Sequence, residues 1–347
     1  MRAPDRSVDV LLIGGGVASV RCARTLRRRG FDGSILIAGG EPRPPYNRPP
    51  LSKQLLRDDL PDELVDAEPA GWYERHSVDL LTDATIVALD PDVRRVTLSE
   101  GGTLAFGRCL LATGASPRAV PVPGGELALL LRTLPDAHRL RRAALAAGAG
   151  APAVIVGGGL IGVEVASGLA ALGLRPTVVE LGRTAWGGSL GSALGTWAVE
   201  RLRAAGVDVR LSSAVTRLEA DAALVGEERL PAAFVVAGVG VRPRDELAAG
   251  AGLAVDDGVL VDSGHRTSHP AVWAAGDVAR VEGRRVEHWH AAREGGERAA
   301  LSMLGLDLPP RRVPWLFTEV AGIALDLFGT SDAWDEERWL GDHAALA

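Results

Sequence analysis

The chain carries the same strand–glycine–helix pattern in two places, and this repeat restricts its fold more than any other feature. Apolar runs at residues 8–13 and 154–156 each lead into a glycine-rich turn, followed by residues with helical spacing. The first glycine of such a turn allows a sharp bend, the second lets backbone N–H groups approach a phosphate, and the third lets helix and strand pack closely. The three positions are Gly14, Gly16 and Ser19 in the first turn, and Gly157, Gly159 and Gly162 in the second.

An acidic residue follows each turn at the end of the next expected strand. Residues 34–38 precede Glu41, and residues 177–179 precede Glu180. A carboxylate in this position accepts a hydrogen bond from a ribose 2′-hydroxyl and repels a 2′-phosphate, so the second motif predicts a preference for NADH over NADPH. The repeat predicts an α/β chain with two Rossmann-like domains that bind two dinucleotides, or one flavin and one nicotinamide.

Two charged residues lie in unusual surroundings. Glu164 is an acid in the first turns of an otherwise apolar helix that begins with Leu160 and Ile161. Its ordinary interpretation is a solvated acid that interacts favourably with the helix dipole. Lys53 is the only lysine among 38 basic residues, and it closes a segment, 41–53, with five prolines in thirteen residues. The prolines exclude a regular helix or a central strand there. A surface lysine is the default interpretation, but a stiff loop indicates an immobilised one.

Composition excludes several classes of function. At 347 residues the chain is long enough for two or three domains, and its net charge of −6 argues against a nucleic-acid binder. Arginine clusters at 27–29 and 139–142 are interpreted as solvated helix ends. Cys22 and Cys109 form no CxxC pair, so we expect no redox dithiol and no metal site, and both pack as small apolar residues. No apolar span of about 18 residues is present, which favours a cytoplasmic protein without a membrane segment.

The remaining patterns predict further elements. We expect a hairpin at 93–98 and 103–106, a strand at 108–111, an apolar strand within 234–243, a buried strand at 272–279, a helix at 287–304 and a strand pair at 313–329. Gly276 either ends its strand or lets Asp277 approach a ligand. Residues 331–347 have no clear period and indicate the start of a third domain.

Five segments together carry a family resemblance: PYNRPPLSK, ATGASPR, AGDVA, EHW and VPW. With them the chain resembles the FAD-dependent ferredoxin reductases that serve cytochromes P450 and Rieske dioxygenases, a family that includes apoptosis-inducing-factor-like proteins. The resemblance implies a two-domain flavoprotein like glutathione reductase with a truncated α+β C-terminal domain. It places FAD in residues 1–117 and 246–312, NADH in residues 118–245, and the short C-terminal domain in residues 313–347.

The same resemblance assigns ligand-binding residues. Gly14 and Gly16 face the FAD pyrophosphate, Glu41 its ribose, Asp277 its ribityl chain and Trp289 the pyrimidine end of its ring. The implied FAD residues are Gly14, Gly16, Ser19, Glu41, Arg48, Lys53, Ala112, Thr113, Gly114, Gly276, Asp277 and Trp289. The implied NADH residues are Gly157, Gly159, Leu160, Ile161, Gly162, Glu180 and Gly238.

Catalytic roles follow from the resemblance for Lys53 and Glu164. Lys53 near flavin N5 would stabilise the electron-rich reduced ring, and Glu164 would neutralise the buried lysine. The sequence departs from the family at Leu316, Phe317, Thr318, Glu319 and Val320, where the family usually has aromatics, a serine and an acid–glutamine pair, and at Ala291, where it usually has asparagine.

The implied activity is hydride transfer from NADH to FAD, followed by electron transfer to a small [2Fe-2S] ferredoxin, by a monomer or homodimer. One alternative is a stand-alone flavin enzyme that reduces oxygen or a small organic acceptor. Another is a slow flavoprotein whose NADH-bound form is a signalling state.

Overall fold

The computed structural model describes residues 6–187 and 190–329, and it divides into two compact units. Unit 1 consists of Asp62–Ser116, Arg242–Arg312 and the described part of Met1–Asn47. Unit 2 consists of Arg48–Pro61, Pro117–Val241 and the described part of Val313–Ala347. The proline-rich loop, residues 41–53, is therefore divided between the units. Its last six residues, which include Lys53, group with unit 2.

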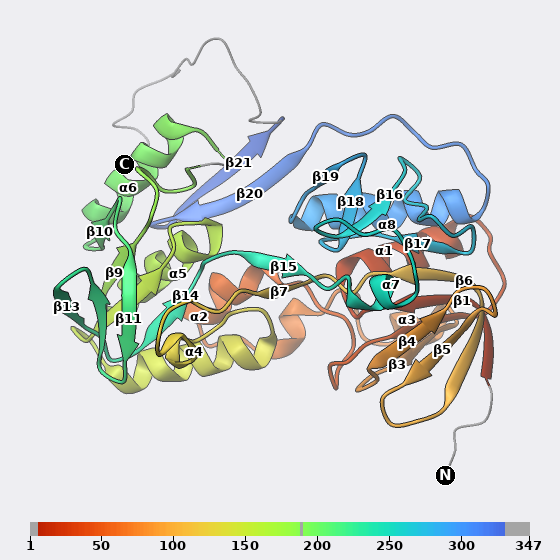
Figure 1. Ribbon diagram of the computed structural model, residues 1–347, viewed down its shortest axis with the longest axis horizontal. Helices are drawn as coiled ribbons and strands as arrows, with labels where there is room; N and C mark the ends of the chain where they lie inside the picture. Colours follow the sequence, from red (N-terminus) through yellow and green to blue (C-terminus); the bar gives the residue numbers. More distant parts are fainter. Residues whose placement is uncertain (1–5, 188–189, 330–347) are drawn as a thin grey trace. The chain divides into compact units, whose positions relative to one another are not determined.

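Unit 1 is built on a seven-stranded sheet (Figure 1). Its order is β3 (Val78–Leu81), β2 (Ile35–Ala38), β1 (Arg6–Ile13), β6 (Thr103–Leu111), β5 (Arg95–Leu98) and β4 (Ile86–Asp90), with β17 (Val272–Ala274) also beside β6. The strands β3, β2, β1, β6 and β17 are parallel, β5 is antiparallel to β6, and β4 is antiparallel to β5.

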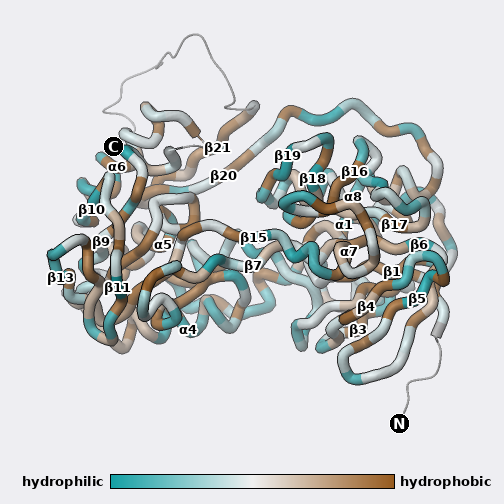
Figure 2. The backbone as a smooth tube through the Cα atoms, in the orientation of Figure 1, coloured by the Kyte–Doolittle hydropathy of each residue, from teal (hydrophilic) through white to brown (hydrophobic). Residues whose placement is uncertain are grey.

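Both faces of this sheet are buried, which explains why its central strands are continuously apolar. Alternate residues of β1 enter opposite cores: Val10 and Leu12 on one face, Leu11 and Ile13 on the other. The apolar strands stand out in Figure 2. The first face is covered by α1 (Val17–Arg28), α8 (Trp289–Met303) and Trp72 of α3 (Trp72–Arg75). The second packs against α7 (Glu246–Gly250), β16 (Val259–Val261) and β18 (Ala279–Val281), which pairs with β19 (Arg284–Arg285).

Unit 2 repeats the parallel arrangement on a smaller scale. Its main sheet has the order β10 (Asp208–Arg210), β9 (Arg175–Val179), β8 (Pro152–Val156), β14 (Val235–Ala237). The helices of this unit are α2 (Gln54–Arg57), α4 (Leu134–Ala147), α5 (Leu160–Ala171) and α6 (Ser192–Ala204). A second sheet joins β11 (Val215–Glu219), β12 (Ala222–Val225) and β13 (Glu228–Pro231), and β20 (Trp315–Val320) pairs with β21 (Ile323–Phe328). Strands β7 (Ala115–Pro117) and β15 (Val241–Pro243) pair where the chain passes between the units.

Most predicted elements are present, and three differ for a visible reason. The expected strands at 103–106 and 108–111 form one strand, β6, because Gly107 permits close approach to β1: a Cβ there would lie 2.7 Å from the Asp9 carbonyl oxygen. The segment 234–243 forms two strands, interrupted by Gly240 at φ +89°. The strand expected at 272–279 ends at Ala274, and Ala279 begins another strand in a different sheet.

The proline-rich loop contains only a 3₁₀ turn, Pro49–Ser52, as its composition predicts. Two more 3₁₀ turns lie at Asp62–Val65 and Gly125–Leu127. The predicted strand pair is β20 and β21, and the expectation for residues 331–347 falls outside the described residues.

The interpretation of the arginine clusters is wrong for two residues. Arg27 donates to the carbonyl oxygens of Phe31, Gly33, His76 and Ser77, and so ties α1 to the loops around it. Arg141 donates to the carbonyl oxygens of Leu56 and Arg57 at the end of α2. Both guanidinium groups satisfy carbonyls that the regular elements leave unpaired, a role that charge patterning along the sequence does not show.

Candidate functional site: two glycine turns and a buried ion pair

The first glycine turn joins β1 to α1 in unit 1. Gly14 has φ +121°, and a Cβ there would lie 2.1 Å from the carbonyl oxygen of Ala112, so only glycine fits. Gly16 is the N-cap of α1, with no side-chain cap, no acid in the first helical turn and no atom within 4 Å of an added Cβ. A helix N-terminus with open space beside it suits a phosphate group.

The ends of neighbouring strands supply the other unit 1 residues. Ala112 follows β6, and Gly276 and Asp277 follow β17, so they lie at the same carboxyl edge of the sheet as Gly14. Ligands of open α/β sheets bind at this edge. Thr113 donates to the carbonyl oxygen of Arg244 at 2.7 Å, and Gly276 has φ +78°.

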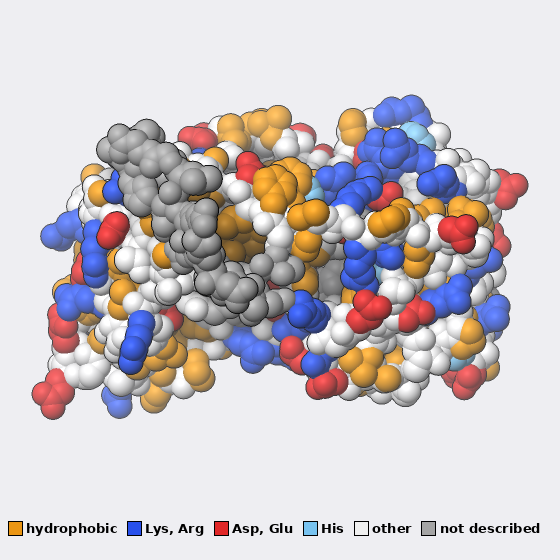
Figure 3. Space-filling model, turned by 90° about the horizontal axis from the view of Figure 1, so that it is seen from above, with side chains coloured by type: hydrophobic (Ala, Val, Ile, Leu, Met, Phe, Trp, Pro, Cys, Tyr) orange, Lys and Arg blue, Asp and Glu red, His pale blue; other side chains and the backbone are white. Residues whose placement is uncertain are grey.

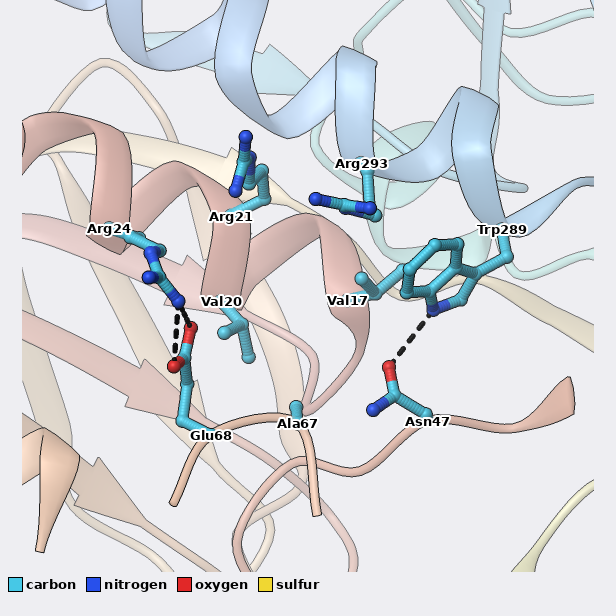
Figure 4. Close-up of a pocket in the computed structure, with 9 residues that line it drawn as sticks. All are labelled: Val17, Val20, Arg21, Arg24, Asn47, Ala67, Glu68, Trp289 and Arg293. Carbon is cyan, nitrogen blue, oxygen red and sulfur yellow. Dashed lines mark hydrogen bonds and ion pairs between the residues drawn. The ribbon is translucent and has the colours of Figure 1, made fainter. Parts of the chain in front are cut away.

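A pocket of unit 1 adjoins this turn through Val17, the first residue of α1 (Figure 4). Trp289 donates its indole N–H to Asn47 Oδ1 at 3.0 Å, and the Arg293 guanidinium lies 4.5 Å from the Trp289 ring centre. The remaining lining residues are Val20, Arg21, Arg24, Ala67 and Glu68.

The pocket is lined by three arginines and one carboxylate, so its lining is net positive. Arg24 forms hydrogen bonds with both oxygens of Glu68. Burial lowers the pKa of Arg293, and the charges of Arg21 and Arg312 lower it further. This donor set, together with the open helix N-terminus, fits an anionic nucleotide such as FAD.

Some basic side chains elsewhere on this unit are paired with acids. Figure 3 shows many of them on the face over α8 and the β18–β19 ribbon. Arg280 pairs with Asp256, and Arg285 pairs with Asp257 and Glu287. These ion pairs reduce the positive charge that the face presents.

The second glycine turn, in unit 2, has the same geometry as the first. Gly157 has φ +105°, and its added Cβ would lie 2.4 Å from the Gly238 carbonyl oxygen, just as Gly14 meets Ala112. Gly159 is the uncapped N-cap of α5. A Cβ at Gly162 would lie 2.0 Å from the Gly157 carbonyl oxygen. Ile161, in the first turn of α5, is an exposed large apolar residue, and Leu160 is half-buried.

The two acidic residues are held differently. Tyr46 donates its hydroxyl to Glu41 at 2.6 Å, so a side chain of the proline-rich loop orients that carboxylate. Glu180 accepts from the backbone N–H groups of Gly158 and Gly182, which ties it to the glycine turn itself. The backbone N–H of Trp186 donates to the Gly158 carbonyl oxygen at 2.9 Å and adds a second tie to this turn.

The buried ion pair lies wholly within unit 2. Lys53 Nζ is 2.6 Å from Glu164 Oε1, with side chains 9% and 4% exposed. Ser52 donates to Glu164 Oε2, and Thr318 donates to Glu164 Oε1 at 2.7 Å. Glu164 is therefore not a solvated acid, and Lys53 is not a surface lysine. A buried charge pair is tolerated when further hydrogen bonds satisfy it, as here.

Sequence reasoning missed three participants. Asn47 and Ser52 belong to the quoted segment PYNRPPLSK, so attention to its polar residues would have found them. Thr318 gave no such indication, because it lies 154 residues from Glu164 and on a strand of the last segment. Arg48, which the resemblance assigns to FAD, groups with unit 2 and donates to the Arg132 carbonyl oxygen.

Other site types find little support in the described part of the chain. There, no group of three or more His, Cys, Asp or Glu side chains is placed to hold a metal ion, and no helix is long and apolar enough to cross a membrane. Cys22 and Cys109 are fully buried free thiols, on α1 and β6, and burial raises the pKa of each well above the usual range.

Residues 8–296 match the family model described as pyridine nucleotide-disulphide oxidoreductase. The chain belongs to this family. It is therefore an oxidoreductase that uses FAD and NAD(H), in agreement with the sequence prediction. The family is described by its disulphide chemistry, but the two cysteines of this chain, Cys22 and Cys109, lie on separate elements and form no pair.

Curated relatives of this oxidoreductase include two reductase components of dioxygenases. The biphenyl dioxygenase system ferredoxin–NAD(+) reductase component of Paraburkholderia xenovorans (strain LB400) is 36% identical over 345 residues, which cover 96% of this chain and 84% of the relative. The ferredoxin reductase component of chlorobenzene dioxygenase from Cupriavidus sp. (strain PS12) is 36% identical over 356 residues, with coverages of 98% and 86%.

Among solved structures, the covalent putidaredoxin reductase–putidaredoxin complex matches with a TM-score of 0.89 and 31% identity, covering 96% of this chain and 84% of that one. The ferredoxin reductase for the CYP199A2 system from Rhodopseudomonas palustris matches with a TM-score of 0.90 and 30% identity, with coverages of 94% and 84%. The predicted resemblance and the predicted fold class are both confirmed.

Proposed function

We propose that the chain is an NADH-dependent flavoprotein reductase that passes electrons to a small iron–sulfur ferredoxin, which in turn serves an oxygenase or a cytochrome P450. The observation that carries this proposal is the presence of two glycine turns of equal geometry, one per unit, together with one buried lysine–glutamate pair. The relatives support the acceptor, because their names describe ferredoxin reductase components of dioxygenases.

FAD is assigned to unit 1 and NADH to unit 2, whose limits differ from those expected from the sequence chiefly in that Arg48–Pro61 group with unit 2. Gly14, Gly16 and the pocket beside Trp289 would hold FAD, because their open helix N-terminus and arginines suit its phosphates. Gly157, Gly159 and Glu180 would hold NADH. Glu180 has both oxygens oriented by backbone N–H groups, which leaves remaining lone pairs for ribose hydroxyls.

The chemistry depends mainly on positioning and charge. Bound FAD would supply the redox chemistry, which is acceptance of a hydride from NADH and release of single electrons to the acceptor. The role of Lys53 is to place a fixed positive charge that stabilises the reduced ring. The role of Glu164 is to hold that lysine charged and in one orientation while it is out of water.

A stopped-flow experiment tests the assignment. Purified FAD-loaded protein is mixed with NADH, and the flavin absorbance is followed; the reduced protein is then mixed with a [2Fe-2S] ferredoxin or, separately, with air-saturated buffer. We expect rapid bleaching by NADH and rapid reoxidation only by ferredoxin. Fast reoxidation by oxygen would support a stand-alone flavin oxidase, and slow bleaching with a long-lived charge-transfer band would support a signalling flavoprotein. A protein that takes up no FAD would contradict the proposal altogether.

Lys53→Met provides a second test, because methionine keeps the length of the side chain and removes the charge. We expect NADH to reduce the flavin of this variant at least tenfold more slowly, since a charge-assisted interaction contributes about 1.5–3 kcal/mol. The control is Arg139→Met, which removes a charge from an exposed position of α4 in the same unit. Equal reduction rates in Lys53→Met and wild type would remove Lys53 from the reaction.

A further inference from the structure

Strand β20 contributes three consecutive side chains to the surroundings of the Lys53–Glu164 pair. Phe317 has its ring centre 5.6 Å from Lys53 Nζ. Thr318, which is 2% exposed, donates to Glu164 Oε1. Glu319 forms an ion pair with Arg57, four residues after Lys53 on α2. The strand thus contacts both partners of the pair and the helix that follows the lysine.

Thr318 and Lys53 share one oxygen of Glu164. Both reach Oε1, at 2.7 and 2.6 Å, whereas Ser52 donates to Oε2. A hydroxyl that donates to Oε1 withdraws negative charge from the oxygen that faces the lysine. It thereby limits how strongly the carboxylate neutralises the ammonium group. Loss of this donor leaves a buried carboxylate lone pair unsatisfied.

The hairpin is fixed against α5 independently of this bond. Ala321 N–H, in the turn between β20 and β21, donates to Ser167 Oγ at 2.9 Å, and Ser167 lies one helical turn after Glu164. The Arg57–Glu319 pair fixes the strand to α2. The hydroxyl of Thr318 is therefore removable without releasing the strand.

We propose that Thr318 is a positioning residue for the reductase reaction: its hydroxyl orients Glu164 and sets how much of the Lys53 charge remains available to the flavin. The proposal rests on the proposed function, since it assumes that the Lys53–Glu164 pair acts on bound FAD. It assigns to the β20–β21 hairpin a part in electron transfer from NADH, in addition to any part in binding the acceptor.

The first test measures the stability of the FAD-loaded protein, so that it does not depend on the reaction. Thr318→Val and Glu164→Gln are made singly and together, and thermal unfolding of all four proteins is compared. We expect Thr318→Val to lower the melting temperature by a few degrees in the wild-type background and by clearly less in the Glu164→Gln background, because the amide carries no charge to satisfy. Equal shifts in the two backgrounds would show that the hydroxyl and the carboxylate do not act together, and would overturn the proposal.

The second test measures the flavin. In FAD-loaded Thr318→Val we expect NADH to reduce the flavin about tenfold more slowly at unchanged KM for NADH, and the flavin midpoint potential to fall below the wild-type value. Thr318→Ser keeps the hydroxyl and should restore both values. Thr216→Val, which removes an exposed strand threonine of the same unit, should change neither.

The outcomes separate the two proposals. A wild-type rate and potential in Thr318→Val would overturn the positioning role while leaving the reductase function intact. A wild-type protein that NADH does not reduce would refute the proposed function, even where the unfolding experiment shows that Thr318 and Glu164 are coupled. Failure of Thr318→Ser to restore the potential would show that the hydroxyl alone does not set it, and would overturn the positioning role.

Discussion

The two glycine turns differ at their third position, and the difference shows what the motif requires. In unit 2 a Cβ at Gly162 would lie 2.0 Å from the Gly157 carbonyl oxygen, so α5 cannot carry a side chain there. In unit 1 the equivalent Ser19 fits and is fully buried. In unit 1 the close approach of α1 is instead to α8, where a Cβ at Gly296 would lie 2.2 Å from the Ala18 carbonyl oxygen. The same motif tolerates serine where another pair of helices provides the tight packing.

The first residue of each turn must be glycine in both units, because it has positive φ and lies close to a backbone carbonyl oxygen. Substitution there should therefore give the largest loss of stability. Gly157→Ala should destabilise unit 2 by about 3 kcal/mol or more, because it combines positive φ with a backbone clash at 2.4 Å. The variant should lose NADH binding while the purified protein stays yellow with FAD. Denaturant unfolding and flavin absorbance measure both.

Gly206→Ala is the matched control in the same unit. Gly206 also has positive φ, at +83°, but an added Cβ meets no atom within 4 Å. It should cost only about 1 kcal/mol and leave NADH binding intact. Similar losses in both variants would mean that backbone strain, and not the close approach to Gly238, makes Gly157 necessary.

Acid should destabilise unit 1 more than unit 2, because among the described residues only unit 1 buries a histidine. His265 lies against the Ala274 carbonyl oxygen at 2.8 Å, and burial, together with the charges of Arg311 and Arg298, lowers its pKa to about 4. In the unfolded chain the His265 imidazole takes up a proton near pH 6.5, whereas in the folded unit it stays neutral down to about pH 4. Stability is therefore complete above pH 6.5 and falls by about 3 kcal/mol as the pH drops to 4.

Urea denaturation at pH 7 and pH 4 measures this loss. His265→Gln, which cannot take up the proton, should lose about 3 kcal/mol less than wild type over the same interval. A variant with the wild-type pH dependence would place the acid sensitivity in other groups.

The acids of the two turns should differ in what they select. Glu180→Ala should reduce the preference for NADH over NADPH about tenfold, because it removes the carboxylate that repels a 2′-phosphate. Glu41→Ala, the equivalent change in unit 1, should weaken FAD retention and leave the nucleotide preference unchanged. The ratio of kcat/KM for NADH and NADPH decides; an unchanged ratio in Glu180→Ala would place recognition of the 2′-position elsewhere.

The smallest expected effect concerns Ser19. Its buried hydroxyl has no hydrogen-bond partner in the structure, so Ser19→Ala removes an unsatisfied polar atom. We expect FAD-free Ser19→Ala to be as stable as wild type or more stable by up to about 1 kcal/mol. A clear destabilisation would show that the hydroxyl is satisfied, and that the serine is there for more than its small size.

The sequence predicted the parts of the fold that depend on local pattern. Both turns, the parallel strands beside them and the stiff loop before Lys53 follow from glycine, proline and apolar periodicity. The continuous strand β6 was missed because a glycine such as Gly107 normally indicates the end of a strand. In the structure Gly107 instead allows β6 to lie close to β1. The resemblance suggested that Glu164 faces Lys53, but no local pattern indicates the hydroxyl of Thr318.

The position of Thr318 also has a consequence for biosynthesis. At about 5–20 residues per second, the ribosome needs roughly 8–30 s to advance the 154 residues from Glu164 to Thr318. Throughout that interval the nascent α5 holds a carboxylate whose last hydrogen-bond donor does not yet exist. Unit 2 therefore reaches its final packing only after β20 has been made, and a ribosome that stalls after α8 leaves this helix incompletely covered.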